Sequence, residues 1–121
     1  MDIRIKRVYA PPSPEDGLRI LVDRLWPRGL TKERAAAGLW LREASPSDDL
    51  RRTFHKAPEE WEEFRRRYAA ELRQPAAAAA LERILAPAAE GRVTLLYAAR
   101  DEERNNAAAL RDYLLARGRE E

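Results

Sequence analysis

Residues 18–22 restrict the fold of this chain more than any other stretch, because four of these five residues are apolar, namely Leu18, Ile20, Leu21 and Val22. A strand with one face in water alternates apolar and polar residues, whereas a strand that is covered on both faces does not. Residues 92–98 contain a second strongly apolar strand pattern. Because helical patterns separate the strands, the sequence predicts an α/β sandwich with a largely parallel sheet flanked by helices.

The other elements follow from turn residues, helix caps and the spacing of apolar residues. Strands are expected at residues 3–8, 18–25, 39–41 and 92–98. Helices are expected at residues 31–37, 47–55, 58–72, 75–87 and 101–118, with Thr31, Ser47 and Asp101 as N-cap residues. A chain of 121 residues can bury one core, so the sequence predicts a single domain over residues 1–121.

The composition excludes several kinds of chemistry. The chain has no cysteine, which excludes thiol nucleophiles and redox couples. Its one histidine, His55, is expected at a helix end, so no dedicated metal site is predicted, although magnesium bound by carboxylates stays open.

Without cysteine or a membrane-spanning segment, a cytoplasmic protein with no membrane contact is expected. The net charge of +2 gives no global field for nucleic acid. The cofactor and the oligomeric state stay unknown.

Polar residues follow two of the predicted strands. Residues 23–29 come after one strand and residues 99–106 after another, and parallel α/β sheets bind ligands beyond the carboxyl ends of their strands. We therefore expect one site that collects Asp23, Arg24, Arg28, Arg100, Asp101, Arg104, Asn105 and Asn106, with Tyr9 and residues 45–47 as neighbours.

Arginines in such a site suit a phosphate or a carboxylate, because the guanidinium group can bind two oxygens at once. An anionic ligand is therefore expected. Asp23 could act as a base, orient a water molecule or only hold arginines in place. In the structural alternative, Asp23 forms an ion pair with Arg24 or Arg28 that ties the strand to the turn. Asp101 is expected to cap a helix rather than to act as an acid.

Several motifs, in order along the chain, resemble those of one bacterial family. They are Asp23-Arg24-Leu25-Trp26-Pro27-Arg28-Gly29, Trp40-Leu41, Pro46-Ser47, Leu50-Arg51, Trp61, Phe64-Arg65-Arg66-Arg67-Tyr68, Glu71-Leu72, Leu95-Leu96-Tyr97-Ala98-Ala99, Asn105 and Ala107. The chain resembles the YeaO-like proteins, which form a domain of unknown function (number 488). The resemblance implies a small Rossmann-like fold, no established activity, and a role on nucleotides or nucleic acids.

The same resemblance singles out the polar residues Asp23, Arg24, Arg28, Ser47, Arg51, Tyr68 and Asn105. Two features of this chain depart from the family pattern and limit what the resemblance implies. Rhodaneses and tyrosine phosphatases, whose folds the family resembles, need a cysteine that this chain lacks. Relatives often place a histidine near Asn105, where this chain has Arg104 and Asn106.

Our leading hypothesis from the sequence is an enzyme that acts on a phosphate-bearing small molecule, a nucleotide or a nucleic-acid end. Asp23 and Asn105 would be catalytic, and Arg24, Arg28, Arg51, Ser47 and Tyr68 would bind the substrate. The alternative is a non-catalytic module that binds an anion or nucleic acid through the same arginines. A third hypothesis makes the charged turn around Arg28 a contact between two copies of the chain.

Overall fold

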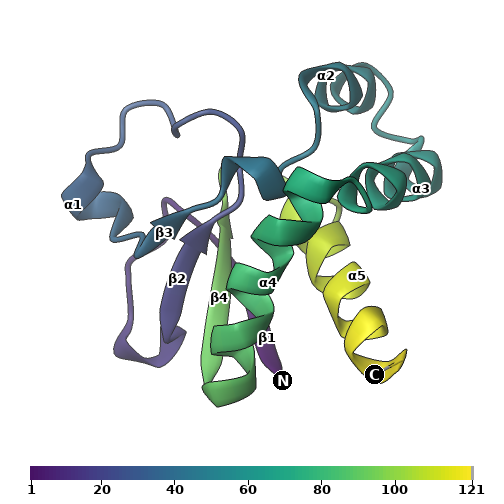
Figure 1. Cartoon of the computed structure of the whole chain (residues 1–121). Coiled ribbons are helices and arrows are strands. Elements are labelled where there is room, and N and C mark those ends of the chain that lie inside the picture. The colour runs from purple at the N-terminus through teal and green to yellow at the C-terminus, as the bar shows by residue number, and fades with distance from the viewer. Residues whose placement is uncertain (121) are drawn as a thin grey trace.

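The computed structural model describes residues 1–120 and contains one four-stranded parallel sheet (Figure 1). Its strands are β1 (Asp2–Arg7), β2 (Leu18–Leu21), β3 (Leu39–Trp40) and β4 (Arg92–Tyr97), in the order β1-β4-β2-β3. The helices are α1 (Lys32–Ala35), α2 (Asp48–Lys56), α3 (Trp61–Leu72), α4 (Pro75–Glu90) and α5 (Asn106–Glu120). Two short 3-10 helices, η1 (Pro14–Asp16) and η2 (Arg42–Ala44), complete the elements. The predicted α/β class with a parallel sheet is confirmed.

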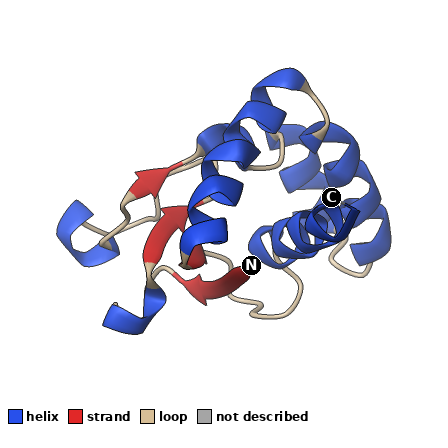
Figure 2. Ribbon diagram, turned by 60° about the horizontal axis from the view of Figure 1, so that its bottom comes forward, coloured by secondary structure: helices blue, strands red, loops and turns tan. Residues whose placement is uncertain are grey.

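The main core lies on one face of the sheet, where the helices gather (Figure 2). Strand residues such as Ile20 and Leu95 are fully buried there against Leu81 and Ile84 of α4 and Leu110 of α5. Burying an aliphatic side chain of this size stabilises the fold by about 1.5–3 kcal/mol. This face therefore supplies most of the apolar burial.

The opposite face has a thinner cover, so the three layers of the sandwich are unequal. Its smaller apolar cluster centres on Leu21 and Leu96 and is closed by Trp26, Leu30 and Ala35, from α1 and the loop before it. Among the residues described, no helix is long and apolar enough to span a membrane.

Four predicted boundaries are wrong. Helix α3 begins at Trp61 rather than at residue 58, because residues 58 and 59 form a turn. Strand β2 ends at Leu21 rather than at residue 25, because the chain turns out of the sheet where the polar residues begin. Helix α4 continues through Pro87 to Glu90, since Ala88 is buried and its packing offsets the backbone bond that proline cannot make. Helix α5 begins at Asn106, so residues 101–105 belong to the loop before it.

Candidate functional site

Asp23 lies at the carboxyl end of β2 and joins two parts of the sheet edge. Its Oδ2 accepts a hydrogen bond from the backbone N–H of Ala98 (2.9 Å), and its Oδ1 accepts one from Nδ2 of Asn106 (3.0 Å). The last backbone bond between β2 and β4 runs from Val22 to Leu96 (3.1 Å), one residue earlier. The carboxylate therefore continues the strand pairing after the backbone has left the sheet.

The ion pair of the structural alternative, between Asp23 and Arg24 or Arg28, is not formed, because neither guanidinium pairs with Asp23 within residues 1–120. Burial raises the pKa of the Asp23 carboxyl above its ordinary value of 3.8. The hydrogen bonds from Asn106 and Ala98 and the charge of Arg51 act in the opposite direction without cancelling the effect of burial on this pKa. Asp23 is thus a carboxylate held by uncharged donors.

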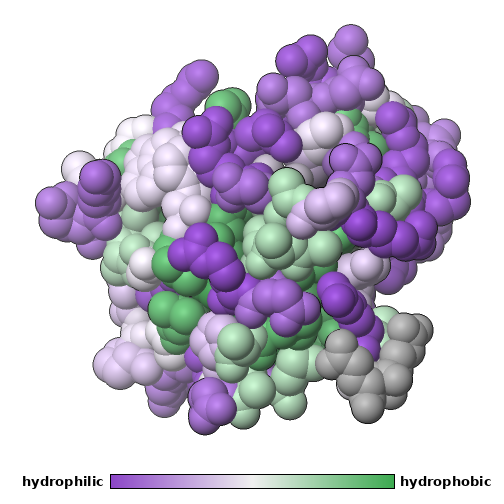
Figure 3. All heavy atoms as spheres, in the orientation of Figure 1, coloured by the Kyte–Doolittle hydropathy of each residue, from purple (hydrophilic) through white to green (hydrophobic). Residues whose placement is uncertain are grey.

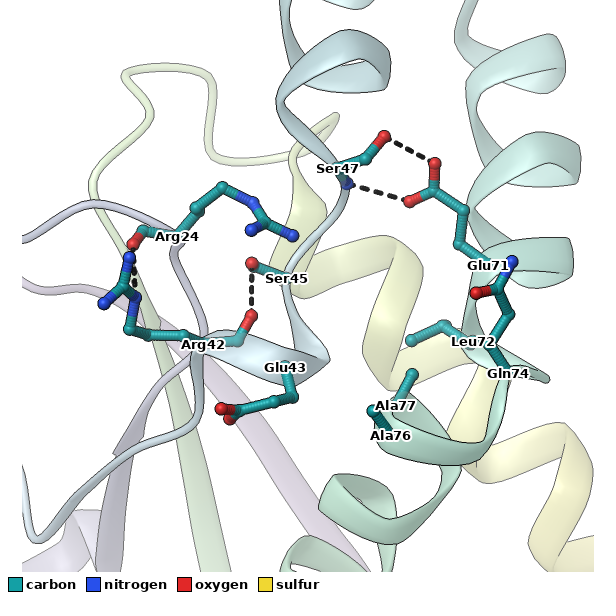
Figure 4. Close-up of a pocket in the computed structure, with 10 residues that line it drawn as sticks. All are labelled: Arg24, Arg42, Glu43, Ser45, Ser47, Glu71, Leu72, Gln74, Ala76 and Ala77. Carbon is teal, nitrogen blue, oxygen red and sulfur yellow. Dashed lines mark hydrogen bonds between the residues drawn. The ribbon is translucent and has the colours of Figure 1, made fainter.

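Arg24 makes no ion pair with Asp23 and lines a pocket of about 440 Å³ (Figure 4). Its Nε donates to the carbonyl oxygen of Pro46 (3.1 Å), and the same atom is 4.0 Å from a carboxylate oxygen of Asp48. Arg42 lines the same wall, where its Nε donates to the carbonyl oxygen of Arg24 (3.2 Å). Both guanidinium groups are thus positioned through Nε, and their terminal nitrogens have no protein partner among the described residues.

Ser47 and Glu71 form a fixed pair on the opposite side of this pocket (Figure 4). The Ser47 N–H and hydroxyl donate to the two oxygens of Glu71 at 2.8 and 2.6 Å. The same hydroxyl accepts the N–H of Leu50 at 3.2 Å, which confirms Ser47 as the N-cap of α2. Glu71 is therefore already occupied, whereas Glu43 on the pocket wall makes no ion pair within the described chain.

Tyr68 lies beneath the site rather than in it. Its side chain is 1% exposed, and its hydroxyl donates to the carbonyl oxygen of Ala44. Burial raises the pKa of the Tyr68 hydroxyl far above its ordinary value, and the negative charges of Asp23 and Glu71 act in the same direction. Tyr68 stays protonated and anchors η2 to α3.

Asn105 is a capping residue in the structure. It is 2% exposed, its Oδ1 accepts the N–H of Ala108 (2.8 Å), and its Nδ2 donates to the carbonyl oxygen of Asp101 (2.9 Å). Asn105 thus takes the N-cap position of α5 that the sequence had assigned to Asp101. Asp101 instead accepts the N–H groups of Glu103 and Arg104, which lowers the pKa of its carboxyl.

Arg28 and Arg51 complete the predicted set but do not line the pocket. Arg28 is exposed, and its carbonyl oxygen accepts the hydroxyl of Tyr9 (2.9 Å). Arg51 is exposed on α2, pairs with Asp48 at 3.3 Å, and is close enough to Asp23 to affect its pKa. Of the predicted residues, Arg24 and Ser47 share the pocket and Asp23 lies beside Arg24 in the chain.

Sequence reasoning missed Arg42, Glu71 and the true partner of Asp23. Asn106 was grouped with the site but without a role, and it contacts both the Asp23 carboxylate and the Val22 carbonyl (3.0 Å each). Arg42 follows the short strand β3, so its place after a parallel strand was the available signal. Nothing in the local sequence of α3 indicates that Glu71 reaches across to Ser47. No three His, Asp or Glu side chains within the described chain come together as a metal site requires.

These features define a class: a small parallel α/β protein with an arginine-lined pocket beside the carboxyl edge of its sheet. The chain belongs to a family of unknown function, since the model for the inactive DUF488-N3 subclade matches residues 2–121. The resemblance to the YeaO-like proteins is thereby confirmed.

Two relatives match nearly the whole chain. The uncharacterized protein YeaO of Escherichia coli (strain K12) is 43% identical over 114 residues, which cover 94% of this chain and 97% of YeaO. The uncharacterized protein Rv3073c of Mycobacterium tuberculosis (strain ATCC 25618 / H37Rv) is 39% identical over 115 residues, 95% of each chain. No solved structure matches this chain.

Proposed function

We propose that the protein is a non-catalytic module that binds a small anionic ligand, one with a phosphate or carboxylate group, in the pocket between Arg24 and Glu71. The observation that carries this proposal is that the guanidinium of Arg24 lines the pocket while its terminal nitrogens have no hydrogen-bond partner among the described residues. Its guanidinium is fixed by one bond to the carbonyl of Pro46 and faces a pocket of about 440 Å³. Its terminal N–H groups are arranged to bind two oxygens of an anion.

The acidic residues of the pocket define the rest of the ligand. Glu71 accepts two hydrogen bonds from Ser47, so its charge is already compensated by fixed donors. Glu43 has no such partner among the described residues and lies on the same wall as Arg42. A ligand that suits both walls carries an anionic group for the arginines and a hydrogen-bond donor for Glu43.

Three observations favour binding over catalysis. Both oxygens of Asp23 are occupied by donors from Ala98 and Asn106, and Asp23 does not line the pocket. The side chain of Asn105 is buried and used in the helix cap. The matching family model describes its members as an inactive subclade.

Titration of the protein with inorganic phosphate, adenosine monophosphate and malonate, followed by amide chemical shifts, tests the proposal. We expect shifts centred on the pocket residues, and at least a tenfold weaker affinity in an Arg24→Gln variant. Arg28→Gln is the matched control, because Arg28 is exposed and does not line the pocket. Equal losses in both variants, or shifts that avoid the pocket, would contradict the proposal.

The salt dependence separates this ligand from nucleic acid. Binding of one small anion in a pocket should weaken little between 50 and 200 mM salt, whereas several phosphate contacts would weaken it by about 10³ or more. A steep loss would therefore favour the nucleic-acid alternative.

The second candidate is an enzyme acting on a phosphate-bearing small molecule, nucleotide or nucleic-acid end. The observation that favours it is the raised pKa of Asp23, since carboxyls with such pKa values often serve as bases. An Asp23→Asn variant that binds the ligand normally but loses a turnover seen in the wild type would establish this candidate instead.

A further inference from the structure

The segment from Arg24 to Arg42 differs in charge from the rest of the chain. It contains five of the 23 basic residues (Arg24, Arg28, Lys32, Arg34 and Arg42) but only one of the 21 acidic residues (Glu33). This segment therefore has a net charge of +4, and the remainder of the chain has −2, within a total of +2. The small net charge of the whole protein is therefore the sum of a basic segment and a slightly acidic remainder.

Four of the five basic residues of this segment also lack acidic partners, whereas Arg24 lies 4.0 Å from a carboxylate oxygen of Asp48. Arg28, Lys32, Arg34 and Arg42 are exposed, and none of the four forms an ion pair within the described residues. Elsewhere, most arginines of strands and helices pair with acids, as Arg66 does with Glu63. Figure 3 shows hydrophilic side chains over α1 at this end of the molecule.

Two large apolar side chains are exposed within the same segment. Leu25 is 57% exposed and Trp40 is 37% exposed. Trp40 packs against the stretch of chain that carries Leu25, because its Nε1 donates to the carbonyl oxygen of Asp23 (2.7 Å) and its ring contacts that of Trp26 at 5.3 Å. We define the basic face as Leu25, Arg28, Lys32, Arg34, Trp40 and Arg42. Trp and Arg are the residues that most often dominate protein–protein interfaces.

The basic face is built on a rigid support. Nε1 of Trp26 donates to the carbonyl oxygen of Leu30 (2.6 Å), and the buried Arg19 donates to the carbonyl oxygens of Ala35 and Ala36 at 2.8 and 3.0 Å. Thr31 caps α1 through the N–H of Arg34 (3.1 Å). A partner would therefore bind a surface that is already ordered, which reduces the entropic cost of binding.

We propose that the basic face docks an acidic segment of a partner protein that carries an apolar side chain. The acidic residues of the partner would neutralise Arg28, Lys32 and Arg34. Its apolar side chain would cover Leu25 and the part of Trp40 that Arg42 and Trp26 leave exposed.

A protein partner fits better than single-stranded nucleic acid. Base stacking needs a free aromatic face. The guanidinium of Arg42 lies over the ring of Trp40 at 5.2 Å, and Trp26 contacts that ring edge-on at 5.3 Å. The most exposed apolar residue, Leu25, is aliphatic and offers no stacking surface.

Selection from a random library of 12-residue peptides displayed on phage, with the full-length protein as bait, tests this proposal. We expect enriched peptides to be acidic with at least one large apolar residue, and to bind an Arg28→Glu/Arg34→Glu double variant at least tenfold more weakly. Arg73→Glu/Arg83→Glu is the matched control. All four arginines are exposed and without ion pairs in the described chain, and Arg73 and Arg83 lie outside the basic face.

Three results would overturn the proposal: no enrichment, enriched peptides without acidic residues, or an equal loss of binding in the control variant. Displacement of the peptide by a lower concentration of oligothymidylate, with the same loss in Arg28→Glu/Arg34→Glu, would assign the face to nucleic acid instead. Because Arg28 and Arg34 do not line the pocket, phosphate titration of the same variants shows independently whether the pocket function stands.

Discussion

Asp16 and Asp23 lie just before and just after β2, and the two carboxylates are stabilised in opposite ways. Asp16, in η1, is 8% exposed, and it pairs with Arg19 at 2.6 Å and with Lys6 at 3.1 Å. Asp23 is held by the backbone N–H of Ala98 and the amide of Asn106. One carboxylate is hydrogen-bonded by two cations and the other by uncharged donors.

The pKa directions follow from this difference. Burial alone would raise the pKa of Asp16, but hydrogen bonds from Ser13, Lys6 and Arg19 outweigh burial and lower this pKa below 3.8. Burial of Asp23 prevails over its partners and raises its pKa. The comparison separates a carboxylate in a structural ion pair, whose pKa is lowered, from one held by uncharged donors, whose pKa is raised.

The largest effect is expected at Asp16. Replacing it with alanine leaves the buried guanidinium of Arg19 without its acid, and breaking one side of a buried pair costs about 3–5 kcal/mol. Urea unfolding of Asp16→Ala measures this change in the free energy of unfolding. The double variant Asp16→Ala/Arg19→Met should be less destabilised than the sum of the two single variants, since no unpaired charge is left. Strict additivity would show that the pair contributes nothing of its own.

A smaller effect is expected at Asp23. Asp23→Ala leaves the Ala98 N–H and the Asn106 amide without an acceptor in a partly buried place, which costs about 2–3 kcal/mol in the free energy of unfolding. Glu59→Ala is the control, because Glu59 is exposed in the turn before α3 and should change stability by less than about 0.5 kcal/mol. If Asp23→Ala proves as neutral as Glu59→Ala, the carboxylate does not hold the sheet edge together.

The polar residues at the two ends of β2 also differ in how well they could be predicted from the sequence. At the carboxyl end the strand was predicted too long, to residue 25 instead of Leu21, but Asp23 and Asn106 were grouped at that edge because a polar run after an apolar strand is a local signal. Their partners were not predicted, since the donors to Asp23 come from residues 98 and 106, which only the finished sheet brings close.

The start of β2 at Leu18 was predicted correctly, but the ion pair between Asp16 and Arg19 at this end was missed. The sequence predicts no strand or helix at residues 10–17, which contain three prolines, yet Asp16 is buried there and its carbonyl oxygen accepts a hydrogen bond from the Thr94 hydroxyl (2.6 Å). The one local hint was Arg19, the single charged residue among the apolar residues 18–22. Its acid lies three residues earlier, and its other acceptors are the carbonyls of Ala35 and Ala36, so the pairing depends on the tertiary fold.

The smallest and sharpest test of the comparison is the titration of the two carboxyls. An acid whose folded pKa is raised holds its proton more tightly in the native state, so Asp23 contributes stability at low pH that is lost as the pH rises through its folded pKa. Asp16 has the opposite sign: its contribution to stability is present above the unfolded pKa and is lost as the pH falls through its lowered folded pKa.

Carbon-13 shifts of the two carboxyl groups should therefore give a midpoint above 3.8 for Asp23 and below 3.8 for Asp16. In urea unfolding, the wild type should lose stability relative to Asp23→Asn as the pH rises from 3.8 through the raised folded pKa of Asp23, because the variant has no carboxyl to deprotonate. A midpoint at or below 3.8 for Asp23 would mean that its uncharged donors compensate the carboxylate as fully as cations do, and the contrast between the two ends of β2 would be lost.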